Sequence, residues 1–413
     1  MKSQLLILGN GFDVHCGLKS TYKYFFRSEI LDTTSEPFGI IQLQDGVTGF
    51  WEEILLEYYK IKNKDDYNWC DIEKIIKDTL LSIYFGNDNS KYDIHNGLCY
   101  KASMYIYHLT ATLHLEKLSD IEKFIFNYCV KFISTNGGEY KDNIKPLIEN
   151  LFQQLRVLER RFCKYLKNQI INPNNENEWS EQYIINSVNL LADLTKFTDK
   201  EFKSMDEIID NLEYEKQQAK KYDIKFEDTI YLCGELYDLF NTNILSFNYT
   251  ALFDILKAKS PCKYSNVHGK LCSGDCATDC SGSSIIFGVD DRIIQAQDTN
   301  SELRLFSKTY RKMLDSGNPI SILPPNDQPV DIIFYGHSLS EADYSYFQSI
   351  FDYYDLYGNS NVSLKFCYSK GYENHEAIYK LISEYGKSLT NKDQGKNLIH
   401  KLLLENRLHI QEI

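Results

Sequence analysis

The sequence lacks an excess of positive charge and lacks any long apolar run, and both absences exclude classes of function. Its 45 Lys and Arg residues are outnumbered by 58 Asp and Glu residues, which leaves a net charge of −13. Non-specific binding of nucleic acid through a basic surface is therefore not expected. No segment approaches the roughly 18 apolar residues of a membrane span, and the apolar run Leu5–Leu8 is too short for a secretory signal. We expect neither nucleic acid nor a membrane as a direct partner.

One local exception to the acidic balance lies on a predicted helix, where Arg156, Arg160 and Arg161 are close in the sequence. A basic patch there would bind an acidic partner, whereas a solvated helix face needs no partner. The solvated face is the favoured interpretation, because charged residues on a helix normally occupy its solvent side.

The 11 cysteines show no disulfide-like spacing, and their number is odd. This favours reduced thiols and a cytoplasmic location. Cys272, Cys276 and Cys280 follow one another at C-x3-C spacing, whereas zinc knuckles favour C-x2-C pairs. Thiols on a polar loop are favoured over a zinc site, and no metal is expected. The alternative of a metal at these three cysteines stays open.

The sequence does contain short, continuous apolar runs, which are typical of strands buried on both faces of a parallel sheet. The first such run is Gln4–Leu8. The others are in the C-terminal part of the chain: Thr242–Phe247, Tyr264–Val267, Ser284–Val289, Val330–Tyr335 and Val362–Tyr368.

The residues between these two groups of strands have a helical pattern almost throughout. The clearest helix has apolar residues in steps of three and four, at Ile144, Leu147, Ile148, Leu151, Phe152, Leu155, Leu158, Phe162 and Tyr165. Leu118–Ile133 and Asp206–Tyr222 are further expected helices. The sequence therefore predicts an α/β protein with a Rossmann-like, mostly parallel sheet. Its nucleotide-binding domain would comprise residues 1–48 and 241–413, with a large all-helical insertion at 49–240 between the first strand and the others.

A glycine turn directly follows the first strand, at Gly9-Asn10-Gly11. A dinucleotide fingerprint has the form G-x-G-x-x-G, but Val14 occupies the place of its third glycine. No second strand is expected within the next thirty or so residues, where such a unit has one. The pattern argues against a standard dehydrogenase. It leaves open a plain turn into a helix and a backbone cradle for a phosphate.

Four polar segments each follow an expected strand. They are Gly9–Asp13, Ser246–Thr250, Val267–Gly269 and Gly336–Ser340. The carboxyl ends of strands in an open α/β sheet converge on one crevice, so these segments are expected to form one site. Each has a simpler alternative. Asn248 could cap a helix, His268 could bond to backbone at a strand end, and Gly336–Ser338 could be a turn capped by a serine.

The motifs G-N-G-F-D, S-F-N-Y-T, V-H-G, I-F-G-V-D and Y-G-H-S-L-S-E-A-D-Y occur in this order. With the opening L-G-N-G-F-D-V-H-C-G-L-K-S-T-Y-K-Y-F and Trp69-x-Asp71-x-Glu73, they resemble the bacteriophage abortive-infection AbiH family. The resemblance implies an antiphage effector that halts the infected cell in response to an unknown phage trigger. Trp69, Asp71 and Glu73 are expected to begin a helix. The alternative is that the insertion covers the crevice and these acids meet ribose hydroxyls or a partner.

The same motifs are more distantly similar to sirtuin-like domains of antiphage NAD hydrolases. This similarity implies a sirtuin-like fold, in which Gly9 and Gly11 match the turn over the pyrophosphate. Asn248 matches the asparagine near the nicotinamide ribose, and His268 matches the catalytic histidine. Gly336 and Ser338 match a late loop on the adenosine side. The chain departs from that pattern in its first motif, which is not G-A-G-x-S, and at Thr250, where those domains tend to carry Asp.

The implied activity is that of an NAD glycohydrolase, with NAD as the substrate. Asn248 and His268 would be catalytic: the amide orients a ribose hydroxyl or a water, and the imidazole accepts a proton. Backbone N–H groups at a helix start would bind the phosphates. The residues expected to bind the nucleotide are Gly9, Asn10, Gly11, Phe12, Asp13, Gly336, His337 and Ser338. Asp13 would cap the helix or bind a ribose hydroxyl, because a carboxylate repels pyrophosphate.

A second interpretation requires no catalysis. In it, the protein binds a nucleotide or a phage component and acts through partner contacts of its helical insertion. A nuclease is disfavoured, because the acidic motifs are scattered instead of clustered for metal binding. A homo-oligomer is left open.

Overall fold

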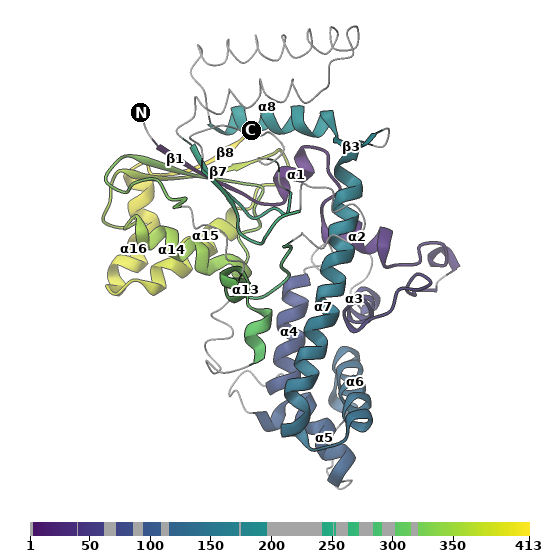
Figure 1. Ribbon diagram of the computed structural model, residues 1–413. Helices are drawn as coiled ribbons and strands as arrows, with labels where there is room; N and C mark the ends of the chain where they lie inside the picture. Colours follow the sequence, from purple (N-terminus) through teal and green to yellow (C-terminus); the bar gives the residue numbers. More distant parts are fainter. Residues whose placement is uncertain are drawn as a thin grey trace. The chain divides into compact units, whose positions relative to one another are not determined.

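The computed structural model describes residues 3–38, 40–61, 72–85, 94–108, 115–172, 175–195, 242–250, 252, 263–271, 284–290, 302–314 and 321–413. The chain divides into two compact units (Figure 1). The first comprises Met1–Ser20, Leu166–Ile285 and Ser316–Ile413, and the second comprises Thr21–Tyr165 and Ile286–Asp315. The domain bounds at residues 48 and 240 stay a prediction, and the second of them lies outside the described residues.

The first unit contains a six-stranded sheet in which every pair of neighbours is parallel. The strand order is β5-β4-β1-β6-β7-β8. The strands are β1 Ser3–Leu8, β4 Thr242–Ser246, β5 Tyr264–Asn266, β6 Val330–Tyr335, β7 Val362–Tyr368 and β8 Leu408–Glu412. The prediction of an α/β protein with a mostly parallel sheet is confirmed. Continuous apolar runs form these strands because both faces of the sheet are covered.

β1 lies in the middle of the sheet, between β4 and β6. Its last residue, Leu8, is in register with Ser246 of β4 and Tyr335 of β6. The three strands therefore end at the same edge of the sheet. Their following loops, which carry the predicted site residues, start side by side.

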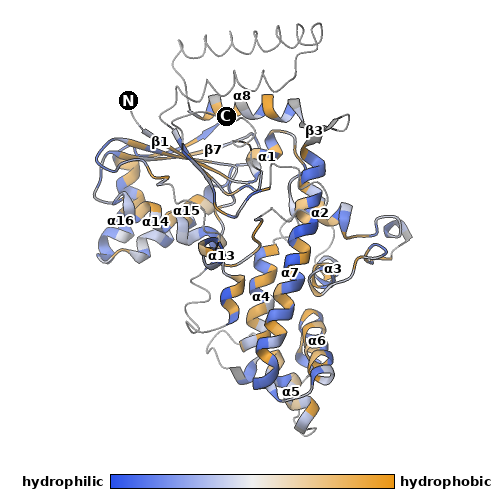
Figure 2. Ribbon diagram, viewed as in Figure 1, coloured by the Kyte–Doolittle hydropathy of each residue, from blue (hydrophilic) through white to orange (hydrophobic). Residues whose placement is uncertain are grey.

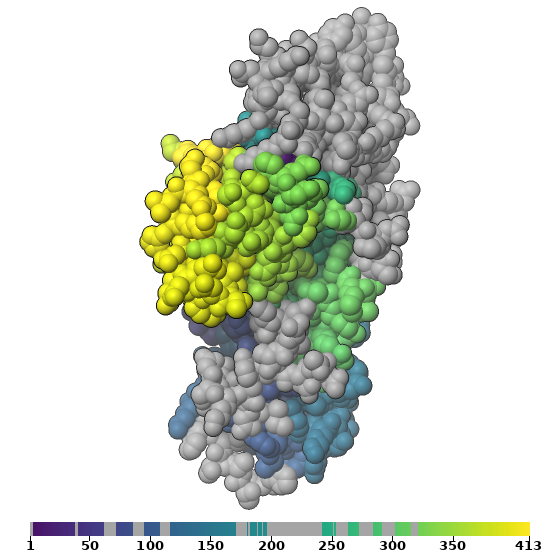
Figure 3. Space-filling view, turned by 90° about the vertical axis from the view of Figure 1, so that its left-hand side faces the viewer, coloured from purple at the N-terminus to yellow at the C-terminus, as the bar shows by residue number. Residues whose placement is uncertain are grey.

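Helices cover the two faces of this sheet (Figure 1). They are α14 Tyr344–Tyr353, α15 His375–Ser388 and α16 Lys392–Leu404 on one side, with α8 Glu181–Thr195 on the other. Phe347, Leu381 and Leu398 of the first group are buried in one cluster with Ile332 and Leu364 of the strands. The residues from β6 onward, coloured green to yellow, form a contiguous region of the surface in Figure 3.

The second unit is built from helices. They are α2 Tyr22–Glu29, α3 Phe50–Ile61, α4 Ile72–Phe85, α5 Leu98–His108, α6 Asp120–Asn136, the part of α7 Tyr140–Ile170 up to Tyr165, and α13 Lys308–Leu314. The helices expected around residues 144–165 and 118–133 are present as α7 and α6. Apolar and polar bands alternate along α7 in Figure 2, as its sequence period requires. The helix expected at Asp206–Tyr222 lies outside the described residues.

The strand expected at Ser284–Val289 is wrong. Residues 284–288 lie in no strand, and only Val289 forms an isolated bridge, with Ser307. Side chains form hydrogen bonds with backbone groups that would pair with a neighbouring strand in a sheet. Phe287 N–H donates to Glu159 Oε1 at 2.8 Å, and Phe287 O accepts from Arg311 at 3.0 Å.

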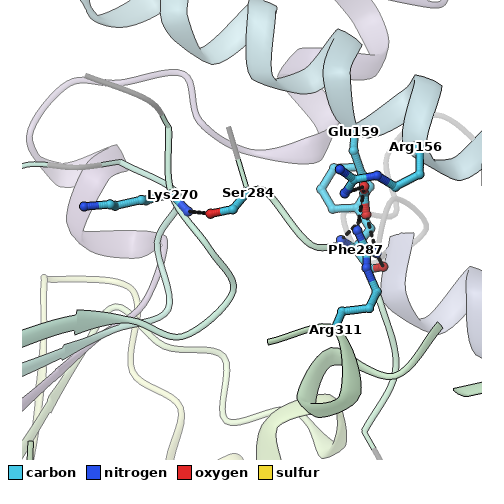
Figure 4. Close-up of polar contacts among 6 residues, drawn as sticks. All are labelled: Arg156, Glu159, Lys270, Ser284, Phe287 and Arg311. Atoms are coloured by element: carbon cyan, nitrogen blue, oxygen red, sulfur yellow. Dashed lines mark hydrogen bonds and ion pairs between the residues drawn. The ribbon is translucent and has the colours of Figure 1, made fainter. Parts of the chain in front are cut away.

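Glu159 is the centre of a buried ionic cluster in the second unit (Figure 4). Its carboxylate lies on α7 and is 2% exposed. Arg311 of α13 donates to both carboxylate oxygens, at 2.6 and 2.9 Å, and Arg156 donates to Oε2 at 2.7 Å. Figure 4 also shows the Lys270 N–H donating to Ser284 Oγ, a contact within the first unit. The cluster fixes α13 against α7 and uses the charge of Arg156.

Two further observations concern the part of the chain that the structure describes. None of the described helices is long and apolar enough to cross a membrane. The five cysteines within the described residues are all buried thiols: Cys16, Cys99, Cys129, Cys163 and Cys367.

Candidate functional site

The glycine turn after β1 packs directly against the glycine turn after β6. Gly9 N–H donates to Tyr335 O at 2.9 Å, and Gly11 N–H donates to Gly336 O at 2.8 Å. Phe12 N–H donates to Gly9 O within the first turn. Three of the backbone donors predicted to face phosphates are thus bonded to the chain itself.

The same contact explains why these positions are glycine. A Cβ on Gly9 would lie 2.4 Å from His337 Cα, and a Cβ on Gly11 would lie 2.6 Å from Gly336 Cα. Gly336 has φ +66°, and a Cβ there would lie 2.5 Å from Phe12 N. Backbone meets backbone at all three positions, so any side chain would force the two loops apart. The plain-turn interpretation accounts for the glycines without a ligand.

Replacing Gly336 with alanine is expected to lower the free energy of unfolding by about 2 kcal/mol or more. The left-handed conformation alone costs a residue with a Cβ roughly 1–2 kcal/mol, and the clash with Phe12 N adds to it. Gly371→Ala is a matched control, because Gly371 has φ +81° but no atom of the described residues within 4 Å of the new Cβ. Urea denaturation of both variants measures the difference, and an equal loss would contradict the clash.

Two protein hydroxyls bind the carboxyl group of Asp13. Asp13 is 1% exposed, and its Oδ1 accepts from Tyr183 at 2.8 Å and from Thr250 at 3.1 Å. Burial raises the pKa of Asp13 to about 7, although both hydroxyls oppose this shift. Asp13 thereby ties α1 (Gly11–His15) to α8 and to the loop after β4.

Two of the predicted site histidines share one carboxylate. His268 Nε2 lies 2.8 Å from Asp343 Oδ1, and His337 Nε2 lies 3.4 Å from Asp343 Oδ2. All three side chains are at least nine-tenths buried. His268 follows β5, His337 follows β6, and Asp343 directly precedes α14. The helix N-terminus favours the negative charge of Asp343.

Backbone contacts define the tautomer of His337. Leu339 N–H donates to His337 Nδ1 at 2.9 Å, so this nitrogen accepts and the ring proton is on Nε2. The Nε2–H group then faces the Asp343 carboxylate. Leu339 has φ +56°, a left-handed conformation that a leucine rarely adopts. The hydrogen bond from Leu339 N–H to the His337 ring accompanies this left-handed conformation.

The ring of Phe247 contacts both imidazoles. It meets the ring of His268 edge-on at 5.2 Å between centroids and that of His337 edge-on at 4.5 Å. Tyr346 also contacts both Phe247 and His268. The Asp343 side chain is 7% exposed, and such burial strengthens its electrostatic interaction with the two rings.

Asn248 is the predicted residue with the clearest vacant bonding capacity. Its side chain is buried, and among the described residues no donor lies within hydrogen-bond distance of Oδ1. Asn266, on β5, holds the loop in place by donating to the carbonyls of Asn248 and Thr250 at 2.9 and 3.0 Å. A buried acceptor without a donor is costly, and a bound ligand or water would relieve that cost.

The structure therefore brings His268 and His337 together on Asp343 and orders Asn248 beside β5 through Asn266. Other predicted residues are used differently. Asn10 exchanges hydrogen bonds with Ser20, and Ser338 is exposed. The sequence prediction missed Asp343, although it lies in the Y-G-H-S-L-S-E-A-D-Y motif. It also missed Tyr183, for which helix α8 offers no local signal.

Most of the remaining residues that the sequence singled out lie outside the described part of the chain. Cys272, Cys276 and Cys280 lie outside the described residues, as do Trp69 and Asp71. Glu73 lies in the first turn of α4 and pairs with Lys308 at 2.7 Å. In the described part of the chain, no group of three or more His, Cys, Asp or Glu side chains is placed to hold a metal ion.

Fold and site together define an α/β protein with polar loops gathered at the carboxyl edge of a parallel sheet. The chain belongs to the bacteriophage abortive infection AbiH family, whose model matches residues 5–368. This membership supports a role in antiphage defence by abortive infection. Comparisons with curated proteins and with solved structures give no match.

Proposed function

We propose that this protein binds NAD in a Rossmann-like, sirtuin-like domain and hydrolyses its nicotinamide–ribose bond to halt the infected cell. The observation that carries the proposal is the pairing of buried His268 with Asp343 at the sheet edge where Asn248 has a vacant acceptor. A base and an orienting amide at the carboxyl edge of a parallel sheet are the groups that this reaction needs.

The strand order supports a nucleotide ligand. Numbered along the chain, the six strands stand in the order 3-2-1-4-5-6, which is the order of dinucleotide-binding sheets. In such sheets the ligand lies outside the carboxyl ends of the strands, where the order reverses. β1 and β6 flank that point here, and their loops carry Gly9–Asp13 and Gly336–Ser338.

The proposed chemistry assigns one task to each residue. Asp343 holds the His268 ring through Nε2, so that Nδ1 is the nitrogen that takes a proton from a ribose hydroxyl or from water. Asn248 Oδ1 accepts from that hydroxyl or water and orients it. The bond to nicotinamide breaks through an oxocarbenium-like state, and water adds to the ribose carbon. Asp343 is a positioning residue, because it acts through His268.

Incubating the purified protein with NAD and following nicotinamide release tests the proposal. His268→Ala is expected to lower the rate about 10²- to 10⁴-fold, the usual contribution of a general base. Asp343→Asn is expected to lower kcat while leaving KM nearly unchanged, since it disturbs only the orientation of His268. His375→Ala is the matched control, because His375 is an exposed histidine at the start of α15.

Release of nicotinamide that His268→Ala leaves unchanged would remove the role of His268. No release from the purified protein, and none from infected cells that express it, would overturn the proposed activity. Calorimetric titration with NAD then shows whether the protein binds NAD without cleaving it or does not bind NAD at all.

One observation favours a second candidate, in which the domain binds a nucleotide or a phage component without cleaving it. The N–H groups of Gly9, Gly11 and Phe12 already donate to the chain, which leaves fewer donors for a pyrophosphate. In that case NAD binds weakly or not at all, and the effect on the cell depends on partner contacts of the helical part of the chain. NAD bound without nicotinamide release would favour it.

A further inference from the structure

Three polar side chains from distant parts of the chain meet at a second place on the carboxyl edge of the sheet. Tyr335 ends β6, Ser369 follows β7, and His15 ends α1. Tyr335 Oη lies 2.6 Å from Ser369 Oγ and 2.9 Å from His15 Nδ1, and Ser369 Oγ lies 2.8 Å from the same nitrogen. Each of the three atoms is within hydrogen-bond distance of the other two. The site around His268 uses none of these residues.

The distances allow an arrangement in which the Tyr335 hydroxyl donates to Ser369 Oγ and the Ser369 hydroxyl donates to His15 Nδ1. In this arrangement Nδ1 is an acceptor, and the proton of the neutral ring is on Nε2. An imidazole that accepts from a serine hydroxyl is the arrangement that activates a serine nucleophile.

The surroundings fit an accessible reaction site. His15 is exposed, Ser369 is half-buried, and Tyr335 is buried behind them. Asp193, on α8, interacts electrostatically with His15. Burial raises the pKa of Asp193, and this interaction lowers it in part.

We propose that Ser369 is a nucleophile, activated by His15, at a site that takes carboxylic esters. Ser369 Oγ forms a bond to the carbonyl carbon while its proton moves to His15 Nδ1. The tetrahedral intermediate then breaks its bond to the alcohol oxygen, which takes that proton and leaves. Water attacks the acyl group on Ser369, gives its proton to His15, and the serine recovers its proton as the acid leaves. An ester suits this set because an alkoxide leaves the tetrahedral intermediate more readily than an amide nitrogen does, and the one proton that His15 holds neutralises it.

Tyr335 completes the set of groups. Its hydroxyl is 2.6 Å from Ser369 Oγ, so it stands beside the atom that becomes bonded to the carbonyl carbon. Once Ser369 has given up its proton and attacked, the Tyr335 hydroxyl can donate to the oxyanion that develops next to it. Burial raises the pKa of Tyr335 and keeps it protonated as a donor.

The test is covalent labelling of the full-length protein with an alkyl fluorophosphonate, followed by peptide mass spectrometry. Ser369 Oγ forms a bond to phosphorus, the P–F bond breaks, and fluoride leaves as the proton passes to His15. We expect one label, on Ser369. His15→Ala should slow labelling about 100-fold or more, as expected for loss of a general base, and Tyr335→Phe should slow it at least about 10-fold.

Ser349→Ala is the matched control, because Ser349 is exposed and its hydroxyl donates to the carbonyl of Ser345. It should label like the unchanged protein. Thermal melting of each variant separates loss of reactivity from loss of the fold. Absence of label on Ser369 in the folded protein would overturn the proposal. Labelling that persists at the same rate in folded His15→Ala would overturn it as well.

Discussion

Replacing Glu159 with alanine is expected to lower the free energy of unfolding by about 3–5 kcal/mol. The substitution leaves the Arg311 guanidinium, which is 8% exposed, without the carboxylate that accepts two of its hydrogen bonds. A buried charge that loses its partner costs about that much. The N–H of Phe287 loses its acceptor at the same time, which adds to the loss.

Urea denaturation measures this effect, and Lys123→Ala is its matched control. Lys123 pairs with Asp120 on the surface of the same unit, and the two side chains are 46% and 73% exposed. Its loss is expected to change the free energy of unfolding by less than about 1 kcal/mol. If Glu159→Ala proved as mild as Lys123→Ala, the ionic cluster would not hold α13 against α7.

Asp13 is expected to make the protein less stable as the pH rises from about 4 to about 8. Its pKa is about 7 in the folded chain against an ordinary value of 3.8, because burial disfavours the charged carboxylate. The folded state therefore holds its proton longer than the unfolded chain does. The stability that this proton confers is complete below the unfolded pKa and is lost as the pH rises through the folded one. A shift of about three pKa units corresponds to about 4 kcal/mol.

Asp13→Asn isolates this effect, because the amide keeps an oxygen for Tyr183 and Thr250 but does not titrate. Relative to the unchanged protein, the variant should gain stability between pH 4 and pH 8 when unfolding is measured across that range. Asp393→Asn is the control, since that side chain is 87% exposed and its charge has no burial cost. A stability difference between Asp13→Asn and the unchanged protein that is the same at every pH would contradict the shift.

The parallel sheet could be predicted because strands that are buried on both faces have continuous apolar runs in the sequence. Val330–Tyr335 and Val362–Tyr368 were predicted at the bounds that β6 and β7 have. Ser284–Val289 has the same kind of apolar run but forms no strand. Glu159 and Arg311 bind its backbone instead, and no local pattern predicts these contacts because both residues are far from it in the sequence. β8 was missed for the opposite reason. It is an edge strand, and its polar, partly exposed residues do not form an apolar run.

The sequence predicted only those residues of the site that directly follow an apolar strand. His268 and His337 both follow apolar strands, and the shared edge brought them together. Asp343 follows a loop and begins a helix, so only its contact with the two rings reveals it. The partner of Asp13 is Tyr183, whose position on α8 depends on packing that no local pattern expresses.

The central place of β1 has a consequence for the synthesis of this protein. Its residues leave the ribosome before any other strand, yet Ser3 pairs with Val330. At 5–20 residues per second, roughly 15 to 65 s separate the two. During that interval β1 lacks its β6 neighbour throughout and its β4 neighbour until residues 242–246 are made, so its unpaired edge is open to chaperones and to other nascent chains. A chain that stops before β6 therefore lacks both the neighbour on that side of β1 and the loop that carries Gly336 and His337.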